Sequence, residues 1–201
     1  MMADTYEVEQ KFRLVDGGPF QTALLALGAR REMEVQQIDW YFDHPTQHFA
    51  QTDEALRLRC CGDQNRVTYK GPKLDALTKT RQEIEVELAP GEEAAASFHA
   101  LMIALGFHYV DQVRKTRHEF VVIWQQHPIH IALDELPDLG RFVELEESQV
   151  PESDLDAARH RIASLASHLG LQPDDGERRS YLELLLASRA ERRDSDMRPS
   201  T

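Results

Sequence analysis

Residues 7–13 of the chain are Glu-Val-Glu-Gln-Lys-Phe-Arg, and this stretch decides how the fold is interpreted. Successive side chains of a β-strand point to opposite faces of the sheet. The two acids and two bases of the stretch therefore share one face, while Val8 and Phe12 lie on the other. A strand face with only charged groups does not belong in an ordinary apolar core. It must be covered either by water or by a highly charged ligand.

The same alternation of charged and apolar residues returns in later segments, so we take it as the plan of the fold. Residues 56–59 are Leu-Arg-Leu-Arg, and residues 81–88 carry a charge at every odd position, with Ile84, Val86 and Leu88 between them. A Gly-Asp-Gln-Asn turn at residues 62–65 predicts a hairpin between its two flanking strands.

Strands are predicted over residues 5–14, 38–43, 56–59, 67–70, 81–88, 114–124, 129–134 and 142–146. Helices are predicted from Pro19 to about Gly28, over about residues 92–105, from a cap at Ser153 to Leu169, and around Tyr181 to Leu185. Residues 71–73 are predicted to form a mobile loop. The fold class that follows is α+β, a closed antiparallel β-barrel of about eight strands with helices packed outside. We expect a single domain over residues 1–190 and a disordered tail over residues 191–201.

Composition narrows the class of protein. The chain has 201 residues, 41% of them hydrophobic, and a formal net charge of −12, which argues against binding nucleic acid by phosphate attraction. No run approaches the roughly 20 apolar residues that a membrane span needs. The two cysteines, Cys60 and Cys61, are neighbours, which suits neither a disulfide framework nor a zinc site. These features predict a cytoplasmic protein. The apolar side of the last helix can pack on the barrel or on a second subunit, so the sequence leaves a homodimer open.

The charged faces have two interpretations. Each strand taken alone fits a β-sandwich whose polar outer faces meet water. Taken together, the faces consist of Arg-x-Arg and Glu-x-Glu pairs, and like charges side by side repel unless an opposite charge lies between them. Arginine forks suit phosphate oxygens, and clustered carboxylates suit a hard cation such as Mg²⁺ or Mn²⁺. A closed sheet would turn both sets into one wet channel, where a polyphosphate with its divalent metals satisfies both.

An ordered series of motifs resembles the CYTH family, the triphosphate tunnel metalloenzymes. The Glu7-x-Glu9-x-Lys11 triplet matches the ExExK signature of that family. The rest of the series is Leu56-Arg57-Leu58-Arg59, Thr68-Tyr69-Lys70-Gly71, Arg81-Gln82-Glu83-Ile84-Glu85, Lys115-Thr116-Arg117, Leu133-Asp134 and Gly140-Arg141-Phe142-Val143-Glu144-Leu145-Glu146. Within the family, residues 39–45, 53–57 and 179–185 are most similar to the class IV adenylate cyclase branch.

The resemblance implies an eight-stranded tunnel that binds a triphosphate through its bases and divalent ions through its acids. The phosphate-binding residues it implies are Lys11, Arg57, Arg59, Lys70, Arg81, Lys115 and Arg117, although Arg81 and Glu83 could equally form a structural ion pair. The metal ligands it implies are Glu7, Glu9, Glu85, Asp134, Glu144 and Glu146, with Mg²⁺ or Mn²⁺ as the cofactor. No side chain is assigned as a catalytic base.

The activity expected from the resemblance is a class IV-type adenylate cyclase, which converts ATP to cyclic AMP and pyrophosphate. One alternative is a triphosphatase acting on thiamine triphosphate or inorganic tripolyphosphate. Another is a non-catalytic binder of polyphosphate or nucleotide.

Two further features have a function in one interpretation and only a structural role in another. The rings of Trp40, Tyr41 and Phe42 could stack on a base or belong to the core. His127 and His130 could bind a metal or lie on the surface.

Overall fold

The computed structural model describes residues 5–72 and 80–196 of the chain. Its strands are β1 (Thr5–Leu14), β2 (Arg30–Asp43), β3 (Ala55–Cys61), β4 (Gln64–Lys70), β5 (Arg81–Leu88), β6 (His108–Trp124), β7 (His127–Leu136) and β8 (Gly140–Pro151). Its helices are α1 (Gly17–Ala26), α2 (Phe49–Thr52), α3 (Glu92–Ala104), α4 (Leu155–His168) and α5 (Tyr181–Asp196), with short 3-10 turns at Glu152–Asp154 and Pro173–Asp175.

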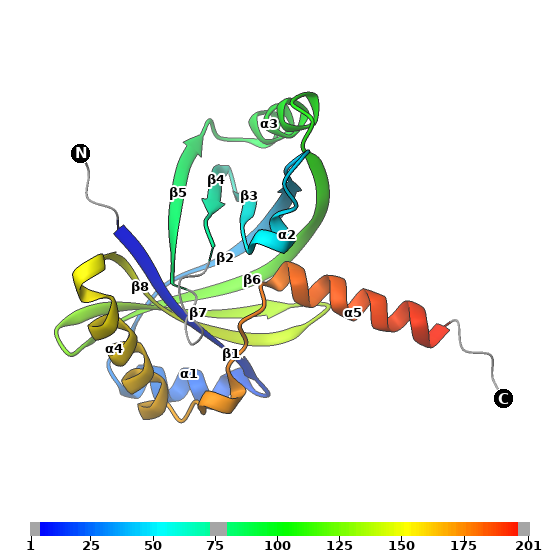
Figure 1. The fold of residues 1–201 in the computed structure, drawn as a ribbon. Coiled ribbons are helices and arrows are strands. Elements are labelled where there is room, and N and C mark those ends of the chain that lie inside the picture. Colours follow the sequence, from blue (N-terminus) through cyan, green and yellow to red (C-terminus); the bar gives the residue numbers. More distant parts are fainter. Residues whose placement is uncertain (1–4, 73–79, 197–201) are drawn as a thin grey trace.

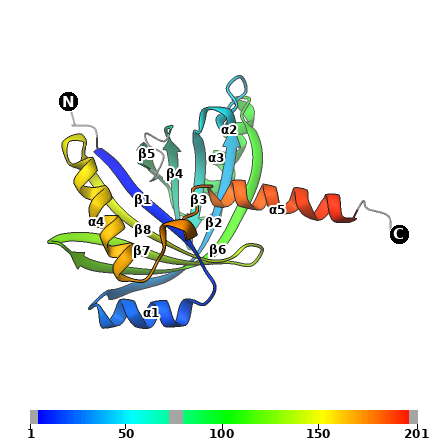
Figure 2. The same cartoon turned by 60° about the horizontal axis from the view of Figure 1, so that its bottom comes forward.

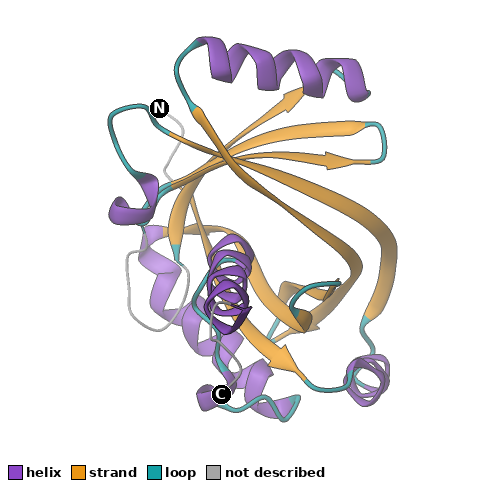
Figure 3. Cartoon of the chain, turned by 90° about the vertical axis from the view of Figure 1, so that its right-hand side faces the viewer, coloured by secondary structure: helices purple, strands orange, loops and turns teal. Residues whose placement is uncertain are grey.

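The eight strands form one closed antiparallel barrel in the order β1-β5-β4-β3-β2-β6-β7-β8 (Figure 1). The helices lie outside the strands, as Figure 3 shows. This confirms the predicted fold class. Strand β1 closes the barrel by pairing with β8 on one side and β5 on the other. Its pairing with β8 is long, while its pairing with β5 is limited to Tyr6 opposite Gln82 and Glu7 opposite Arg81.

The apolar core lies between the outer face of the barrel and the helices. The largest cluster joins β1, β7 and β8 to α1 and α4, and its fully buried side chains include Val8, Ile131, Leu145, Ile162 and Leu165. In Figure 2, α1 and α4 lie against this side of the barrel, while α5 extends away from it. Most apolar strand residues therefore lie on the outer face of the barrel, where many meet the helices while Ile84 and Val86 of β5 stay exposed, and the charged faces are left for the interior.

The predicted elements differ from the structure mainly at their ends. Strands β2 and β6 begin at Arg30 and His108, well before the predicted residues 38 and 114, because two long strands pair with each other along most of their length. Their early residues are mostly polar, and apolar ones among them such as Met33, Tyr109 and Val110 are exposed, so no sustained apolar face marked these strand starts. Ser153 does not cap α4. It lies in a 3-10 turn, and its hydroxyl donates to Asp154.

The C-terminal region also departs from the prediction. Helix α5 continues to Asp196, although a disordered tail was predicted from residue 191. Residues 197–201 of that predicted tail, and Lys73 of the predicted mobile loop, lie outside the described residues. Tyr181, Leu184 and Leu185 are buried against Val113, Leu136 and Phe142, so the apolar side of α5 packs on the barrel.

The aromatic residues at the end of β2 divide between the two faces. Trp40 and Phe42 point outward to α3, where Trp40 meets His99 and Phe42 meets Phe98 edge to face. Tyr41 points inward. None of the described helices is both long enough and apolar enough to cross a membrane.

Candidate active site

A cavity of about 600 Å³ lies inside the barrel and is lined mainly by charged side chains. It brings together twelve of the thirteen predicted site residues: Glu7, Glu9, Lys11, Arg57, Arg59, Lys70, Arg81, Glu85, Lys115, Arg117, Glu144 and Glu146. The ionic faces of the strands therefore turn inward to a common channel, and the interpretation as a sandwich with solvated outer faces is wrong.

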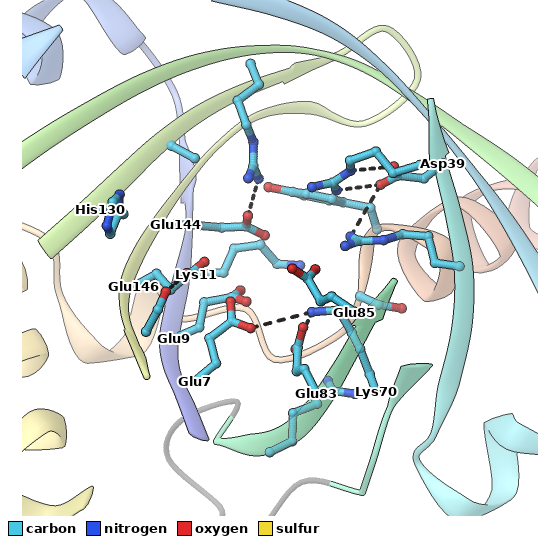
Figure 4. Close-up of a pocket in the computed structure, with 18 of the residues that line it drawn as sticks. Glu7, Glu9, Lys11, Asp39, Lys70, Glu83, Glu85, His130, Glu144 and Glu146 are labelled. Carbon is cyan, nitrogen blue, oxygen red and sulfur yellow. Dashed lines mark hydrogen bonds and ion pairs between the residues drawn. The ribbon is translucent and has the colours of Figure 1, made fainter. Parts of the chain in front are cut away.

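Acidic side chains occupy one wall of the cavity. Strands β1 and β8 are neighbours, and their register sets Glu9 opposite Glu146 and Lys11 opposite Glu144. Figure 4 shows Glu7, Glu9 and Glu146 close together, with Glu83 and Glu85 of β5 beside them. Alternation alone puts these residues inward, and the closure of β1 against β8 and β5 makes them neighbours.

The crowding of carboxylates shifts their pKa values in opposite directions. Burial and the negative charge of Glu7 raise the pKa of Glu146 well above its usual range. Burial, opposed by Lys70 but reinforced by Glu7, raises the pKa of Glu83 to about 7. Burial would also raise the pKa of Glu7, but Lys70 and hydrogen bonds with Glu146 and Glu83 outweigh it and lower that pKa to about 2. The acidic wall therefore holds protons that a cation could replace.

Basic side chains occupy the opposite wall, on β3 and β6. Arg57 and Arg59 are held by Asp39 of β2, which accepts from Arg59 Nε at 2.7 Å and lies 3.6 Å from Arg57 NH1. Arg57 NH2 also donates to Thr68, while the buried Nε of Arg57 has no hydrogen-bond partner. An arginine fork with an unused buried donor is suited to an anionic ligand.

Asp39 was not predicted as a site residue. It is 1% exposed, and although burial opposes ionisation, Arg59 and Arg57 hold its pKa well below the usual range. In the sequence it stands between Ile38 and Trp40, with no second acid two residues away to mark a charged face. Only the pairing of β2 with β3, which puts Asp39 opposite Arg59, reveals its role.

Asp134 is the one predicted site residue that does not line the cavity. Its oxygens accept from Lys115 Nζ at 3.0 Å, from Arg117 Nε at 2.7 Å and from the Tyr181 hydroxyl at 2.8 Å. Asp134 is 1% exposed, so it holds two bases of the wall from behind. Arg117 also donates to Glu144, which links the basic wall to the acidic one.

The segment before α5 adds residues that the sequence did not predict. Ser180 and Tyr181 line the cavity. The ring of Tyr181 lies 4.1 Å from Lys11 Nζ and 5.0 Å from Lys115 Nζ, and Lys11 Nζ donates to the Arg179 carbonyl. Burial and Arg117 lower the pKa of Lys115 to about 8, although Asp134 opposes them. These contacts fix two predicted phosphate-binding lysines at the point where α5 meets the barrel.

The remaining predicted residues occupy the sides of the cavity. Lys70 forms an ion pair with Glu83, and its Nζ lies 3.9 Å from Glu7. A structural ion pair was one of the two alternatives for Glu83. Glu83 does form an ion pair, and its partner is Lys70. Arg81 is buried, with NH1 3.5 Å from the Gly71 carbonyl. His130 also lines the cavity, next to Glu146 in the sheet.

A divalent cation fits the acidic wall by the chemistry of its donors. Carboxylate oxygens are the ligands that Mg²⁺ and Mn²⁺ prefer, and in this wall burial and the neighbouring Glu7 carboxylate raise the pKa values of Glu83 and Glu146. Over the described ranges, no group of three or more His, Cys, Asp or Glu side chains is already arranged around one point as a metal site. The donors are present, and binding would draw them together.

The comparison with known proteins agrees with this geometry. The profile of the CYTH domain matches residues 5–181, which is most of the chain. The chain belongs to the CYTH family. This confirms the family resemblance found in the sequence. CYTH enzymes act on triphosphates, as adenylate cyclases or triphosphatases, and depend on divalent metals.

Two CYTH relatives align over nearly the whole chain. A protein of Methanocaldococcus jannaschii named "Putative adenylate cyclase" is 35% identical over 178 residues, which cover 89% of this chain and 97% of that protein. The adenylate cyclase CyaB of Aeromonas hydrophila is 31% identical over 182 residues, which cover 89% of this chain and 88% of CyaB.

Solved structures show the same fold. The PH1819 protein from Pyrococcus horikoshii has a TM-score of 0.78 and 35% identity, covering 90% of this chain and 98% of that one. A Vibrio parahaemolyticus protein described as a "putative adenylate cyclase" has a TM-score of 0.76 and 26% identity, covering 91% and 99%.

Proposed function

We propose that this protein is an adenylate cyclase that converts ATP to cyclic AMP and pyrophosphate with the help of Mg²⁺ or Mn²⁺. The observation that carries the proposal is the division of the cavity into a basic wall around Arg57, Arg59, Lys115 and Arg117 and an acidic wall around Glu7, Glu9 and Glu146. A triphosphate complexed with a divalent metal carries both kinds of charge and satisfies both walls. The two CYTH relatives named as adenylate cyclases favour a nucleotide as the triphosphate.

The basic residues bind and orient the phosphates. We assign this role to Lys11, Arg57, Arg59, Lys70, Arg81, Lys115 and Arg117, all of which line the cavity. Asp39 and Asp134 set the direction of the arginine forks, so their donors are fixed before the ligand arrives. Preorganised donors stabilise charge that develops in the transition state without the cost of reorganisation.

We assign metal binding to Glu7, Glu9, Glu144 and Glu146, with Glu85 nearby, and leave out Asp134 because its oxygens already accept from three side chains. A bound divalent cation supplies Lewis-acid polarisation of the phosphate and neutralises its charge. The ribose 3′-oxygen forms a bond to the α-phosphorus, the bond from that phosphorus to the bridging oxygen breaks, and pyrophosphate leaves. The hydroxyl proton is lost, and we assign no side chain as its acceptor.

We place the reaction in the cytoplasm, because Cys60 and Cys61 are both free thiols and the reducing cytosol keeps protein thiols in this form. We propose no nucleic-acid partner. The basic wall is enclosed by the barrel, and the net charge of −12 repels the phosphates of a nucleic acid from the outer surface.

One assay tests the proposal. The pure protein is incubated with Mg²⁺ or Mn²⁺ and, in separate reactions, with ATP, thiamine triphosphate or tripolyphosphate, and the products are identified by chromatography. Cyclic AMP and pyrophosphate from ATP are the expected products. Orthophosphate release from any of the three, without cyclic AMP, would make the protein a triphosphatase. Tight binding with no turnover would make it a binder only.

A further inference from the structure

Strand β8 contains a β-bulge at the mouth of the cavity, next to the acidic wall. The register with β1 passes from Val8 opposite Glu147 to Tyr6 opposite Val150, so two residues of β8 face the single residue Glu7. One of the two, Gln149, has a φ of 56°, a left-handed conformation that costs a non-glycine residue free energy. Such a conformation persists only where the surrounding contacts hold it.

The bulge decides which side chains of β8 face inward. Glu146, Ser148 and Gln149 line the cavity, and the Ser148 hydroxyl donates to Glu146. Glu147 and Val150 point outward, and both are almost fully buried between the barrel and α4. In a regular strand Gln149 would point outward and Val150 inward, so the bulge keeps Val150 in the outer core two residues after Ser148, the partner of Glu146.

A buried ion pair holds the bulge from outside. Arg161 of α4 donates to Glu147 with both arms of its guanidinium, Nε to Oε2 at 2.9 Å and NH2 to Oε1 at 2.5 Å. His127 Nδ1 lies 3.3 Å from the same carboxylate. A second cavity of about 170 Å³ borders the outer side of the bulge, so close packing does not fill this region. The directional contacts of Arg161 therefore hold Glu147, the residue between Glu146 and the bulge.

We infer that Arg161 and Glu147 are positioning residues for the metal site. Their ion pair fixes the backbone at residue 147 and thereby the position of the neighbouring Glu146, whose carboxylate lies next to Glu7. This inference rests on the proposed function, because it takes Glu7 and Glu146 as metal ligands. Outer partners that orient ligands typically contribute about 10–100-fold to metal affinity.

The test replaces both charges at once, because removing one would leave a buried charge without a partner. In the double variant Glu147→Leu/Arg161→Met, apolar side chains of similar size take the place of both charged ones, while the directional contacts are lost. Mn²⁺ binding without nucleotide is measured by electron paramagnetic resonance, and thermal unfolding by circular dichroism. The matched control is Glu135→Leu/Arg141→Met, which removes an exposed ion pair between β7 and the far end of β8.

We expect the double variant to fold and its dissociation constant for Mn²⁺ to rise about 10–100-fold, while the control keeps wild-type affinity. A folded double variant with wild-type affinity for Mn²⁺ overturns the inference and leaves the proposed function intact. A wild-type protein that binds no Mn²⁺ overturns both. If the double variant does not fold, Glu147→Gln serves in its place, since it keeps the shape and weakens the ion pair, and unchanged Mn²⁺ affinity in that variant overturns the inference.

Discussion

The replacement Asp39→Asn tests whether this carboxylate is the counter-charge of the basic wall. Asp39 is 1% exposed and makes its two short contacts to Arg59, at 2.7 and 2.8 Å. Loss of one partner from a buried ion pair costs roughly 3–5 kcal/mol, because the other charge stays buried without compensation. The asparagine oxygen keeps one hydrogen bond, worth about 1 kcal/mol. We therefore expect a loss of about 2–4 kcal/mol in the free energy of unfolding of the ligand-free protein.

The same change should strengthen the binding of a polyanion. Two unit charges about 6 Å apart interact by roughly 3 kcal/mol at an effective dielectric constant of 20, and Asp39 repels any phosphate held by Arg57 and Arg59. About half of this remains after screening by salt and relaxation of the arginines. A gain of about 1.4 kcal/mol corresponds to roughly tenfold tighter binding of tripolyphosphate.

Two measurements check these expectations. Urea unfolding gives the stability of the ligand-free protein, and isothermal titration with tripolyphosphate gives the affinity. The control is Asp156→Asn, which removes an exposed ion pair with Arg159 and should change neither quantity by more than a few tenths of a kcal/mol. An Asp39→Asn protein of unchanged stability would show that Asp39 is not the counter-charge of the basic wall, and weaker binding of tripolyphosphate would show that its orientation of the arginines outweighs its repulsion of the phosphates.

Three further predictions concern the two walls and the segment that joins them. Glu9→Gln should raise the Mg²⁺ concentration for half-maximal activity at least about tenfold and shift the unfolding temperature little. A variant that is largely unfolded, but whose folded fraction keeps full specific activity, would contradict the ligand role of Glu9. Tyr181→Phe removes the hydroxyl that donates to Asp134 but keeps the ring beside Lys11, so we expect a loss of about 1 kcal/mol in urea unfolding, and a loss above about 3 kcal/mol would mean that the hydroxyl has another role. The pKa of Glu83 is raised to about 7 in the folded protein, so its contribution to stability is complete below the unfolded pKa of 4.5 and is lost as the pH rises through 7. The unfolding temperature in EDTA should therefore fall between pH 5 and pH 8, and Mg²⁺ or Glu83→Gln should reduce this fall; an equal fall in all three samples would refute the assignment.

The sequence by itself determined the class of fold and most of the cavity lining. A period of two fixes which side of a strand each residue faces, so the charged set could be chosen without knowing the neighbours of any strand. Glu7, Arg57, Lys115 and Glu144 were found in this way, and all four line the cavity. The strand starts at Arg30 and His108 were missed because their few apolar residues stand among charged and polar ones and form no sustained apolar face, and the end of α5 at Asp196 was missed because its last residues are polar.

Only the tertiary structure decided which charges meet. Asp39 became a partner of Arg59 through the pairing of β2 with β3, and Asp134 was drawn behind Lys115 and Arg117 by the pairing of β6 with β7. Alternation predicts the face to which a side chain points but not the residue that lies opposite it. The opposite residue depends on strand order, register and bulges, which are set by residues far apart in the chain. The bulge at Gln149 and the contact of Glu147 with α4 also depend on tertiary structure, since no local pattern in β8 predicts an ion pair with Arg161 of the next helix.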